Sequence, residues 1–344
     1  MDLISNPYAP GAGTSPPALA GREDEIARFD LLIGRLGRGM AERSLILHGL
    51  RGVGKTVLLS ELANRSEQAG WAYVRQEIRR DSPAGLTVAR LVEQGLAELE
   101  HAGKTKEAFK RALRALASFR ATVSSEGNLS LGLDVKPQQG LADSGDLELD
   151  VVSLLSELGR AAADAGRGVV FLLDELQLAV RAELEGLVAA LHMAAQEQFP
   201  VALVGAGLPT LPGKVLDAKT YAERLFRFPE LGPLNDEAAR EALVAPASDL
   251  GVEFRPDAVE RILTESEGYP YFIQEWGRAA WNAARGSVID ATALDRAASV
   301  VGHELDEDFF GMRTERMTPA ELKYCHALAG LGDGPHPSGE VAKA

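Results

Sequence analysis

Residues 44–56 read SLILHGLRGVGKT, a short apolar run that passes directly into a glycine-rich loop. The run SLILH predicts a buried strand, and the residues after the loop predict a helix that extends to about residue 66. Residues 49–56 match the pattern G-x-x-x-x-G-K-[ST], whose backbone N–H groups wrap phosphates. The helix that follows directs its positive N-terminal end at the same anion. This stretch therefore predicts a phosphate-binding loop on an α/β fold.

The glycines of this loop permit its tight turns, because glycine adopts positive φ angles at little cost. Lys55 can reach the β- and γ-phosphates as a point charge, and Thr56 offers a hydroxyl to Mg²⁺. The pattern thus predicts that ATP binds here with magnesium. The residues expected to contact the nucleotide are Gly49, Gly52, Val53, Gly54, Lys55, Thr56 and Val57.

A second apolar run, GVVFLLDELQ (168–177), predicts a central strand that ends in two acids. A carboxylate at the end of such a strand, beside the strand of the phosphate loop, holds Mg²⁺ through its water shell. This predicts Asp174 as a metal residue together with Thr56. Side chains diverge at a strand end, so Glu175 is expected to point elsewhere and to polarise the attacking water.

Strands that alternate with helices dominate residues 21–233 and predict a parallel sheet covered by helices on both faces. The segment 121–150 is polar and bears several glycines, which indicates either an insertion or a mobile hairpin. Further strands are expected at 71–78 and 200–207, and further helices at 22–38, 87–120 (two helices), 150–165 and 182–196.

The two ends of the chain differ from this central part. Residues 1–20 hold four prolines among glycines and serines, which predicts an extended arm. Residues 234–305 predict a small helical domain that begins with Asn235 as an N-cap. In the segment 306–344, Thr318 is expected to start another helix through a capping box with Glu321.

Composition limits the class of protein. Apolar residues make up 46% of the 344 residues, which is typical of a soluble protein, and none of the apolar runs approaches the roughly 20 residues that span a membrane. The N-terminus lacks the basic start and apolar stretch of a secretion signal. The single cysteine, Cys325, excludes an internal disulfide and is expected to be a buried residue on a helix. We therefore expect a cytoplasmic protein without membrane association.

Together these motifs resemble the AAA+ ATPases, and within them the origin-recognition-like branch of archaeal-type ATP-binding proteins. Residues 49–56 are similar to the Walker A motif of this family, and Leu172–Glu175 to its Walker B motif. LAGREDEI (19–26) resembles the element that begins these domains and lies against the adenine. The resemblance therefore implies adenine contacts from Gly21 and Arg22, and catalytic roles for Glu175 and Lys55.

The resemblance extends into the second half of the chain. YAERLFRFPELGPL (221–234) resembles the segment that carries an arginine near a subunit boundary and then enters a helical lid. It implies that Arg224, or else Arg227, is a catalytic arginine finger that acts across that boundary in a homo-oligomer. The alternative is that Arg224 pairs with Glu223 or an acid of the lid and only fastens the two domains. EGYPYFIQEWGRAAW (267–281) resembles the lid helix.

Two motifs depart from the pattern of the family. LVGAGLPTL (203–211) occupies the place of the sensor strand, but it ends in Gly205–Gly207 rather than in a polar residue. A polar contact to the γ-phosphate would then come from Thr210 or be absent. The lid begins with Gly268–Tyr271, which is similar to the G-x-P lid of the signalling, STAND-type branch, and Arg278 is poorly placed to replace the usual lid arginine.

The segment 306–344 resembles the first helices of a winged helix, whose reading helix and wing would lie beyond Ala344. It holds seven acidic and four basic residues, and the whole chain has a net charge of −14, so duplex DNA should bind only weakly. The basic helix expected at 104–120 is either a packed helix with a solvated face or a docking surface for DNA or an acidic partner.

These observations favour a slow magnesium-dependent ATPase, a hydrolase whose nucleotide state sets the positions of the lid and the C-terminal segment. The alternative is a nucleotide-dependent switch or scaffold that turns over negligibly and recruits a protein partner. The weak sensor residues and the acidic surface favour the switch, whereas Glu175 beside Asp174 favours the ATPase. A small-molecule kinase is disfavoured, because the sequence shows no arginine-rich lid for a substrate.

Overall fold

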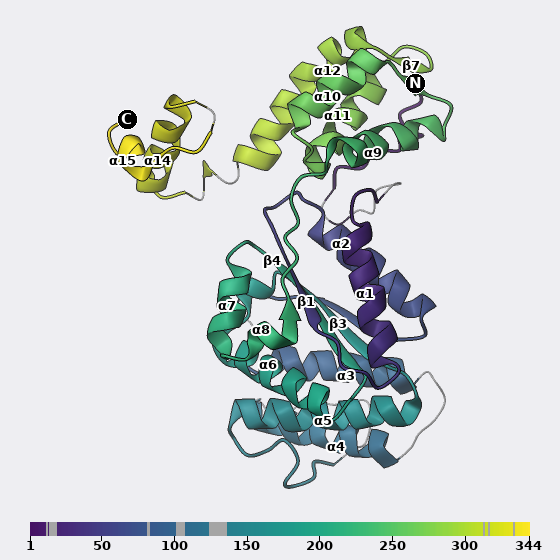
Figure 1. Cartoon of the computed structure of the whole chain (residues 1–344), viewed down its shortest axis with the longest axis vertical. Coiled ribbons are helices and arrows are strands. Elements are labelled where there is room, and N and C mark those ends of the chain that lie inside the picture. Colours follow the sequence, from purple (N-terminus) through teal and green to yellow (C-terminus); the bar gives the residue numbers. More distant parts are fainter. Residues whose placement is uncertain are drawn as a thin grey trace.

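The apolar runs of the sequence form a five-stranded parallel sheet in the computed structural model of the chain (Figure 1). The strand order is β2-β3-β4-β1-β5. The strands are β1 (Ser44–His48), β2 (Ala72–Glu77), β3 (Val169–Asp174), β4 (Val201–Gly207) and β5 (Phe226–Arg227). The structure describes residues 1–11, 13, 19–80, 83–100, 107–123, 136–311, 314–315, 317–332 and 334–344.

The lateral order of the strands corrects one expectation. We expected the strand that ends in Asp174 to lie beside the strand of the phosphate loop, but β4 lies between β3 and β1. Val204 of β4 aligns with Leu172 on one side and with Leu45 on the other. Because all three strands are parallel, their carboxyl ends still meet at one edge of the sheet, where the loops that follow β1 and β3 converge.

Alternate side chains of the strands enter two separate cores. Ile46 packs with the helices of one face, whereas Leu45 and Leu47 pack with those of the other, as a period of two requires. The helices α1 (Glu23–Leu36) and α2 (Lys55–Gln68) cover the second face. The first face is covered by α3 (Leu86–Glu100), α5 (Leu147–Ala165), α6 (Arg181–Gln196) and α7 (Leu211–Ala218), with α8 (Ala222–Leu225) beside them.

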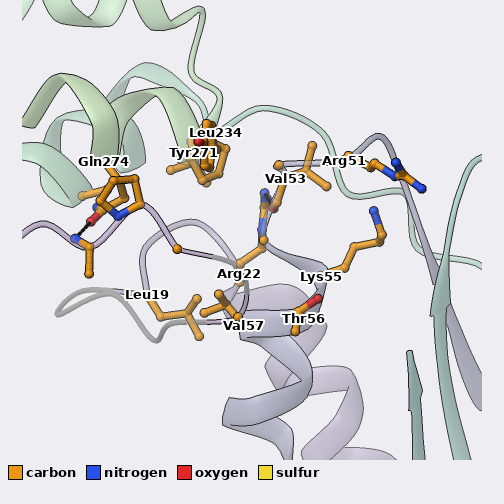
Figure 2. A pocket seen from close by; sticks show the side chains of 18 of the residues that line it. Leu19, Arg22, Arg51, Val53, Lys55, Thr56, Val57, Leu234, Tyr271 and Gln274 are labelled. Atoms are coloured by element: carbon orange, nitrogen blue, oxygen red, sulfur yellow. Dashed lines mark hydrogen bonds between the residues drawn. The ribbon is translucent and has the colours of Figure 1, made fainter. Parts of the chain in front are cut away.

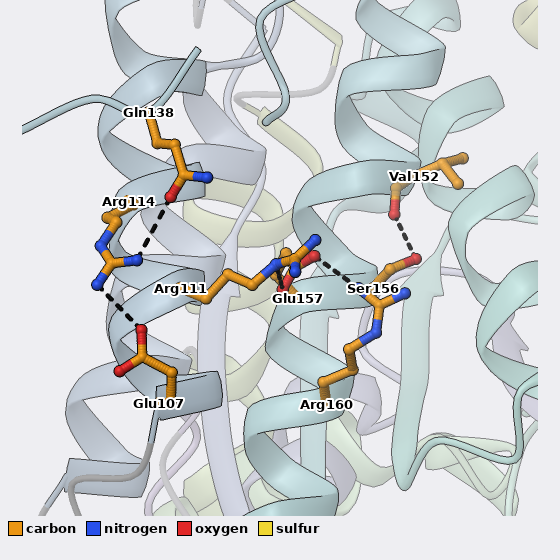
Figure 3. A network of polar contacts seen from close by, with 8 residues as sticks. All are labelled: Glu107, Arg111, Arg114, Gln138, Val152, Ser156, Glu157 and Arg160. Atoms are coloured by element: carbon orange, nitrogen blue, oxygen red, sulfur yellow. Dashed lines mark hydrogen bonds and ion pairs between the residues drawn. The ribbon is translucent and has the colours of Figure 1, made fainter. Parts of the chain in front are cut away.

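The helix α4 (Glu107–Val123) packs on α3 and α5 as an outer layer. Its arginines are occupied within the protein, because Arg111 and Arg160 both pair with the buried Glu157, at 3.0 Å and 2.5 Å (Figure 3). Arg114 pairs with Glu107, and Arg120 is buried against Glu93. These contacts favour the packed-helix interpretation of the basic segment. Lys104 and Lys106, which belonged to that expected helix, lie outside the described residues.

Helices enter the segment expected as an insertion or a mobile hairpin, 121–150, from both sides. The helix α4 continues to Val123, and α5 begins at Leu147, where the Asp146 carboxylate caps the backbone N–H groups of the first turn. Leu141 and Ala142 are buried in the core. Helix capping and two apolar contacts thus order described residues near the start of α5, while an insertion or hairpin within 121–150 stays a prediction. Residues 124–135 lie outside the described residues.

Residues 236–304 form a mainly helical unit with its own apolar core, which we call the lid. Its helices are α9 (Asp236–Ser248), α10 (Pro256–Ser266), α11 (Pro270–Ala283) and α12 (Ala291–Glu304). Asn235 caps α9 by accepting a hydrogen bond from the Ala238 amide, which confirms the predicted N-cap. The lid also contains two short parallel strands, β6 (Glu253–Phe254) and β7 (Val288–Ile289), which the sequence did not indicate.

The chain ends in a π-helical turn, Leu305–Gly311, and the helices α14 (Pro319–Gly330) and α15 (Ser338–Val341). The predicted capping box is present, with reciprocal hydrogen bonds between Thr318 and Glu321. Cys325 lies on α14 and is exposed, so the expectation of burial was wrong, because α14 buries none of its residues. In the part of the chain that the structure describes, no helix has both the length and the apolar content to cross a membrane.

Candidate nucleotide-binding site

A cleft of about 570 Å³ lies between the carboxyl edge of the sheet and the lid (Figure 2). Its floor is the loop between β1 and α2, and its far end is the pair of acids that follows β3. Its residues include Ala9, Pro10, Gly11, Leu19, Ala20, Arg22, the segment 51–57, Asp174, Glu175, Leu234, Tyr271 and Gln274.

Glycine is required at different positions of the loop for different structural reasons. Gly52 and Gly54 have φ angles of 87° and 91°, which side chains rarely adopt, and Gly54 is the N-cap of α2. The backbone N–H groups of 52–54 donate to no acceptor among the described residues, so they are available to an anion. Gly49 does not line the cleft, and a Cβ there would lie 2.1 Å from the carbonyl oxygen of Leu231.

Lys55 is held inside this loop. Its side chain is 7% exposed, and its Nζ donates hydrogen bonds to the carbonyl oxygens of Gly49 and Leu50, at 2.9 Å and 2.7 Å. Burial lowers the pKa of Lys55, while the carboxylates of Glu175 and Asp174 act in the opposite direction. The ammonium group is thus held by two loop carbonyls in the cleft that the two acids also line, where the β- and γ-phosphates of a nucleotide would add the anionic partner.

Thr56 and Asp174 meet directly, because the Thr56 hydroxyl donates to Oδ2 of Asp174 at 2.6 Å. Both groups offer the hard oxygen atoms that Mg²⁺ prefers. The described residues contain no cluster of three or more histidine, cysteine or acidic side chains that could hold a metal by themselves. This pattern fits Mg²⁺, which proteins bind through one or two side chains together with phosphates and water, rather than a metal held in an all-protein cage.

Glu175 begins the turn after β3 in a left-handed conformation, with φ 52° and ψ 34°. Such a conformation costs a non-glycine residue about 1–3 kcal/mol and is concentrated at functional sites. Glu175 lines the cleft, and its carboxylate accepts a hydrogen bond from the side-chain Nε2 of Gln177. Asp174 and Glu175 both line the cleft, and the role of Glu175 toward the attacking water stays a prediction.

An N-terminal strap, which we define as residues 1–11, supplies a wall of the cleft that the sequence did not indicate. Tyr8 is 3% exposed, and its hydroxyl donates to the Leu243 carbonyl in the lid. The amide of Ala9 donates to Gln274 of α11 at 3.3 Å, which brings the next residues of the strap into the cleft (Figure 2). Only the aromatic Tyr8 within this proline-rich arm signalled a buried contact.

The two residues expected to contact adenine, Arg22 and Gly21, lie in different surroundings. The Arg22 guanidinium lines the cleft but donates to the carbonyl oxygens of Val53, at 3.0 Å, and Gly232, at 2.8 Å. It therefore joins the phosphate loop to the linker that leads into the lid. Gly21 packs against the lid, where a Cβ would lie 2.8 Å from that of Ala238. Their contacts with adenine stay a prediction.

Other predicted residues lie away from the cleft. The Arg224 side chain is 81% exposed, with Glu223 at 4.0 Å, and Arg227 donates to Glu42 at 3.2 Å. Thr210 is exposed at the start of α7 and does not line the cleft. Arg278 pairs with Glu275 at 2.8 Å and with Glu304, inside the lid. Within one chain, the structure does not bring these arginines or Thr210 to the site.

A family model described as "AAA ATPase domain" matches residues 18–204, which is more than half of the chain. The chain belongs to the AAA ATPase family. In this AAA ATPase, the matched region runs from the residues before α1 to the middle of β4 and includes the phosphate loop and both acids. A second model, described as a domain of unknown function (DUF8462), matches residues 307–344. The search among curated proteins gave no match.

Solved structures support the fold of this AAA ATPase. A Walker-type ATPase from Pyrococcus abyssi is similar with a TM-score of 0.52 and 17% identity, over 93% of this chain and 82% of the other. Cdc6p from Pyrobaculum aerophilum gives 0.52 and 16%, over 88% and 71%. A RuvB mutant from Thermotoga maritima gives 0.51 and 16%, over 94% and 81%. These similarities confirm the P-loop α/β fold.

The contact between the strap and the lid of this AAA ATPase should contribute to stability. A Cβ at Gly277 of α11 would lie 2.5 Å from the Tyr8 ring, so Gly277→Ala should displace the strap and destabilise the lid by about 1–3 kcal/mol. The measurement is the melting temperature, which should fall by several degrees. The control is Gly302→Ala on α12, where a Cβ meets no atom within 4 Å and a small stabilisation is expected. Equal melting temperatures for the two variants would contradict the role of the strap.

Proposed function

We propose that this protein is a slow magnesium-dependent ATPase whose nucleotide state sets the positions of its lid and C-terminal segment. The observation that carries the proposal is the place of Glu175, which lies beside Asp174 and lines the same cleft as Lys55. Binding of a nucleotide needs only the phosphate loop and a metal residue. A second carboxylate at this point is the group that an ATPase uses to activate water.

The residues of the cleft divide this work. Mg²⁺ bound with ATP would neutralise phosphate charge, and Thr56 and Asp174 are the residues that would hold it. Lys55 and the N–H groups of 52–54 would bind and orient the phosphates. Glu175 would accept a proton from the attacking water. The cleft walls from the strap and the lid would limit the access of bulk water to the site.

Two features support slow turnover. The end of β4 consists of Gly205, Ala206 and Gly207, none of which has a polar side chain to stabilise developing charge. Arg278 is already paired with Glu275 and Glu304 in the lid. Loss of a single stabilising donor can cost about 10²–10³ in rate, so the lack of both in one chain would leave a low basal activity.

Hydrogen bonds between the lid and the phosphate loop support a nucleotide-dependent lid position. The Tyr271 amide, in the first turn of α11, donates to the carbonyl oxygen of Gly52 at 3.3 Å. Arg22 joins Val53 of the loop to Gly232 of the linker. Since phosphate binding acts on the same loop, it can change these contacts, and through them the position of the lid.

The second candidate is a switch that binds ATP, turns over negligibly and recruits a protein partner. The occupied Arg278 and the glycines at the end of β4 favour it. Steady-state phosphate release separates the two functions: the ATPase releases phosphate continuously, while the switch binds ATP by calorimetry without release above the background of a Lys55→Ala control. Duplex DNA at about 150 mM salt should leave the rate unchanged, since the acidic chain lacks the charge that drives DNA affinity.

The proposed function also includes assembly of the chain into a homo-oligomer. Arg224 is exposed on the short helix α8, from which it could reach the nucleotide site of a neighbouring copy. Molar mass by size-exclusion chromatography with light scattering, measured with ATP and with ADP, tests this point. A monomer under both conditions would assign Arg224 to the surface only.

A further inference from the structure

Gln177 occupies an unusual place beside the cleft. It lies in the short 3₁₀ turn η1 (Leu176–Leu178) after β3 and is 6% exposed. Its Nε2 donates to the Glu175 carboxylate, and its Oε1 accepts a hydrogen bond from the Leu208 amide at 3.2 Å. Leu208 directly follows β4, so one buried amide connects the acid after β3 with the end of the neighbouring strand.

The orientation of this amide is determined by its partners. A backbone N–H can be met only by an oxygen, so Oε1 must face Leu208 and Nε2 must face Glu175. The carbonyl oxygen of Gln177 accepts a further hydrogen bond from Lys214 Nζ of α7 at 2.7 Å. Nε2, Oε1 and the backbone carbonyl of Gln177 all form hydrogen bonds. These bonds hold Nε2 in one position beside Glu175.

The glycines at the end of β4 provide the space for this arrangement. A Cβ at Gly207 would lie 2.3 Å from Oε1 of Gln177, and a Cβ at Gly205 would lie 2.4 Å from Cδ2 of Leu176. Any larger residue at these positions would displace the turn. The lack of a polar side chain at the end of β4 thus has a physical reason, because Gln177 occupies that space from the adjacent strand.

We propose that Gln177 is a positioning residue for ATP hydrolysis, which fixes the Glu175 carboxylate toward the phosphate loop. The inference rests on the proposed ATPase function. Gln177 does not line the cleft, so it acts through Glu175 and not on the nucleotide. Glu175 is in the left-handed conformation, and the hydrogen bond to one of its oxygens leaves the other free to accept a proton from water.

The central experiment compares Gln177→Leu with the wild type in steady-state phosphate release and in ATP binding by calorimetry. We expect kcat to fall about 10-fold to 100-fold, because misplacement of a catalytic group by about 1 Å has effects of this size. The affinity for ATP should stay within about twofold. The matched control is Gln196→Leu, at the exposed end of α6, which should change neither quantity.

Two further variants exclude a merely structural role. Gln177→Glu places a second carboxylate beside Glu175, so the acid limb of its pH–rate profile should move to higher pH. Gly207→Ala disturbs Gln177 from the opposite side, and it should lower kcat in the wild type but add little to Gln177→Leu. Fully additive effects of the two substitutions would overturn the proposal.

The possible outcomes separate this inference from the proposed function. If the wild type binds ATP but releases no phosphate, the proposed ATPase function fails and the positioning role fails with it. If the wild type turns over and Gln177→Leu keeps its kcat and pH profile, the ATPase function stands and the role of Gln177 is overturned.

Discussion

Glu175→Gln is expected to bind ATP with wild-type affinity and to release phosphate at least about 100-fold more slowly, since a general base contributes about 10²–10⁴ to a rate. The amide keeps the shape of the side chain but cannot accept the proton of the attacking water. Glu175 follows β3 in a left-handed conformation and lines the cleft, but it is not part of the phosphate loop. Its substitution should therefore leave ATP binding unchanged. Steady-state phosphate release and calorimetry measure the two quantities separately.

Two variants serve as comparisons for this result. Glu197→Gln, at the exposed C-terminal end of α6, should behave as the wild type. Asp174→Asn should instead weaken the magnesium dependence of binding, because Asp174 contacts the Thr56 hydroxyl at 2.6 Å. Wild-type hydrolysis in both Glu175→Gln and Asp174→Asn would rule out a Walker-type ATPase.

Lys55→Ala should reduce the affinity for ATP about tenfold to a hundredfold, the equivalent of one charge-assisted phosphate contact. The side chain is buried among loop carbonyls, so its loss also leaves the acceptors of Gly49 and Leu50 without their donor. Calorimetry measures the affinity, and circular dichroism checks that the variant is folded. Lys110→Ala, on the exposed face of α4, is the control. Unchanged affinity in Lys55→Ala would mean that the nucleotide binds elsewhere.

The local patterns of the sequence predicted the sheet and its loop well, because each depends on neighbouring residues. The run before Gly49 and the run before Asp174 both form buried strands, and the helix after the loop begins at Lys55. The strand order could not be derived, since chain order does not say which strand pairs with which. That is why β4 was not expected between β1 and β3.

Contacts between distant segments were the part that the sequence did not reveal. Tyr8 meets Leu243 across more than two hundred residues, and an arm rich in proline and glycine has no periodicity that indicates such a partner. The burial of Arg120, by contrast, could have been predicted from the sequence. It follows Phe109, Leu113 and Leu116 at helical spacing, which places it on the same apolar face, and it is indeed buried.

The linker between the sheet and the lid has a consequence for the kinetics of ligand exchange. Leu231 donates from its amide to the His48 carbonyl at 2.7 Å and passes so close to Gly49 that no side chain fits there. The linker is thus bonded to the end of β1, and the bonds from Arg22 and Tyr271 attach the linker and the lid to the middle of the loop. The residence time of ADP would then depend on how often these attachments open, so release of product could limit the cycle even if the chemical step were fast.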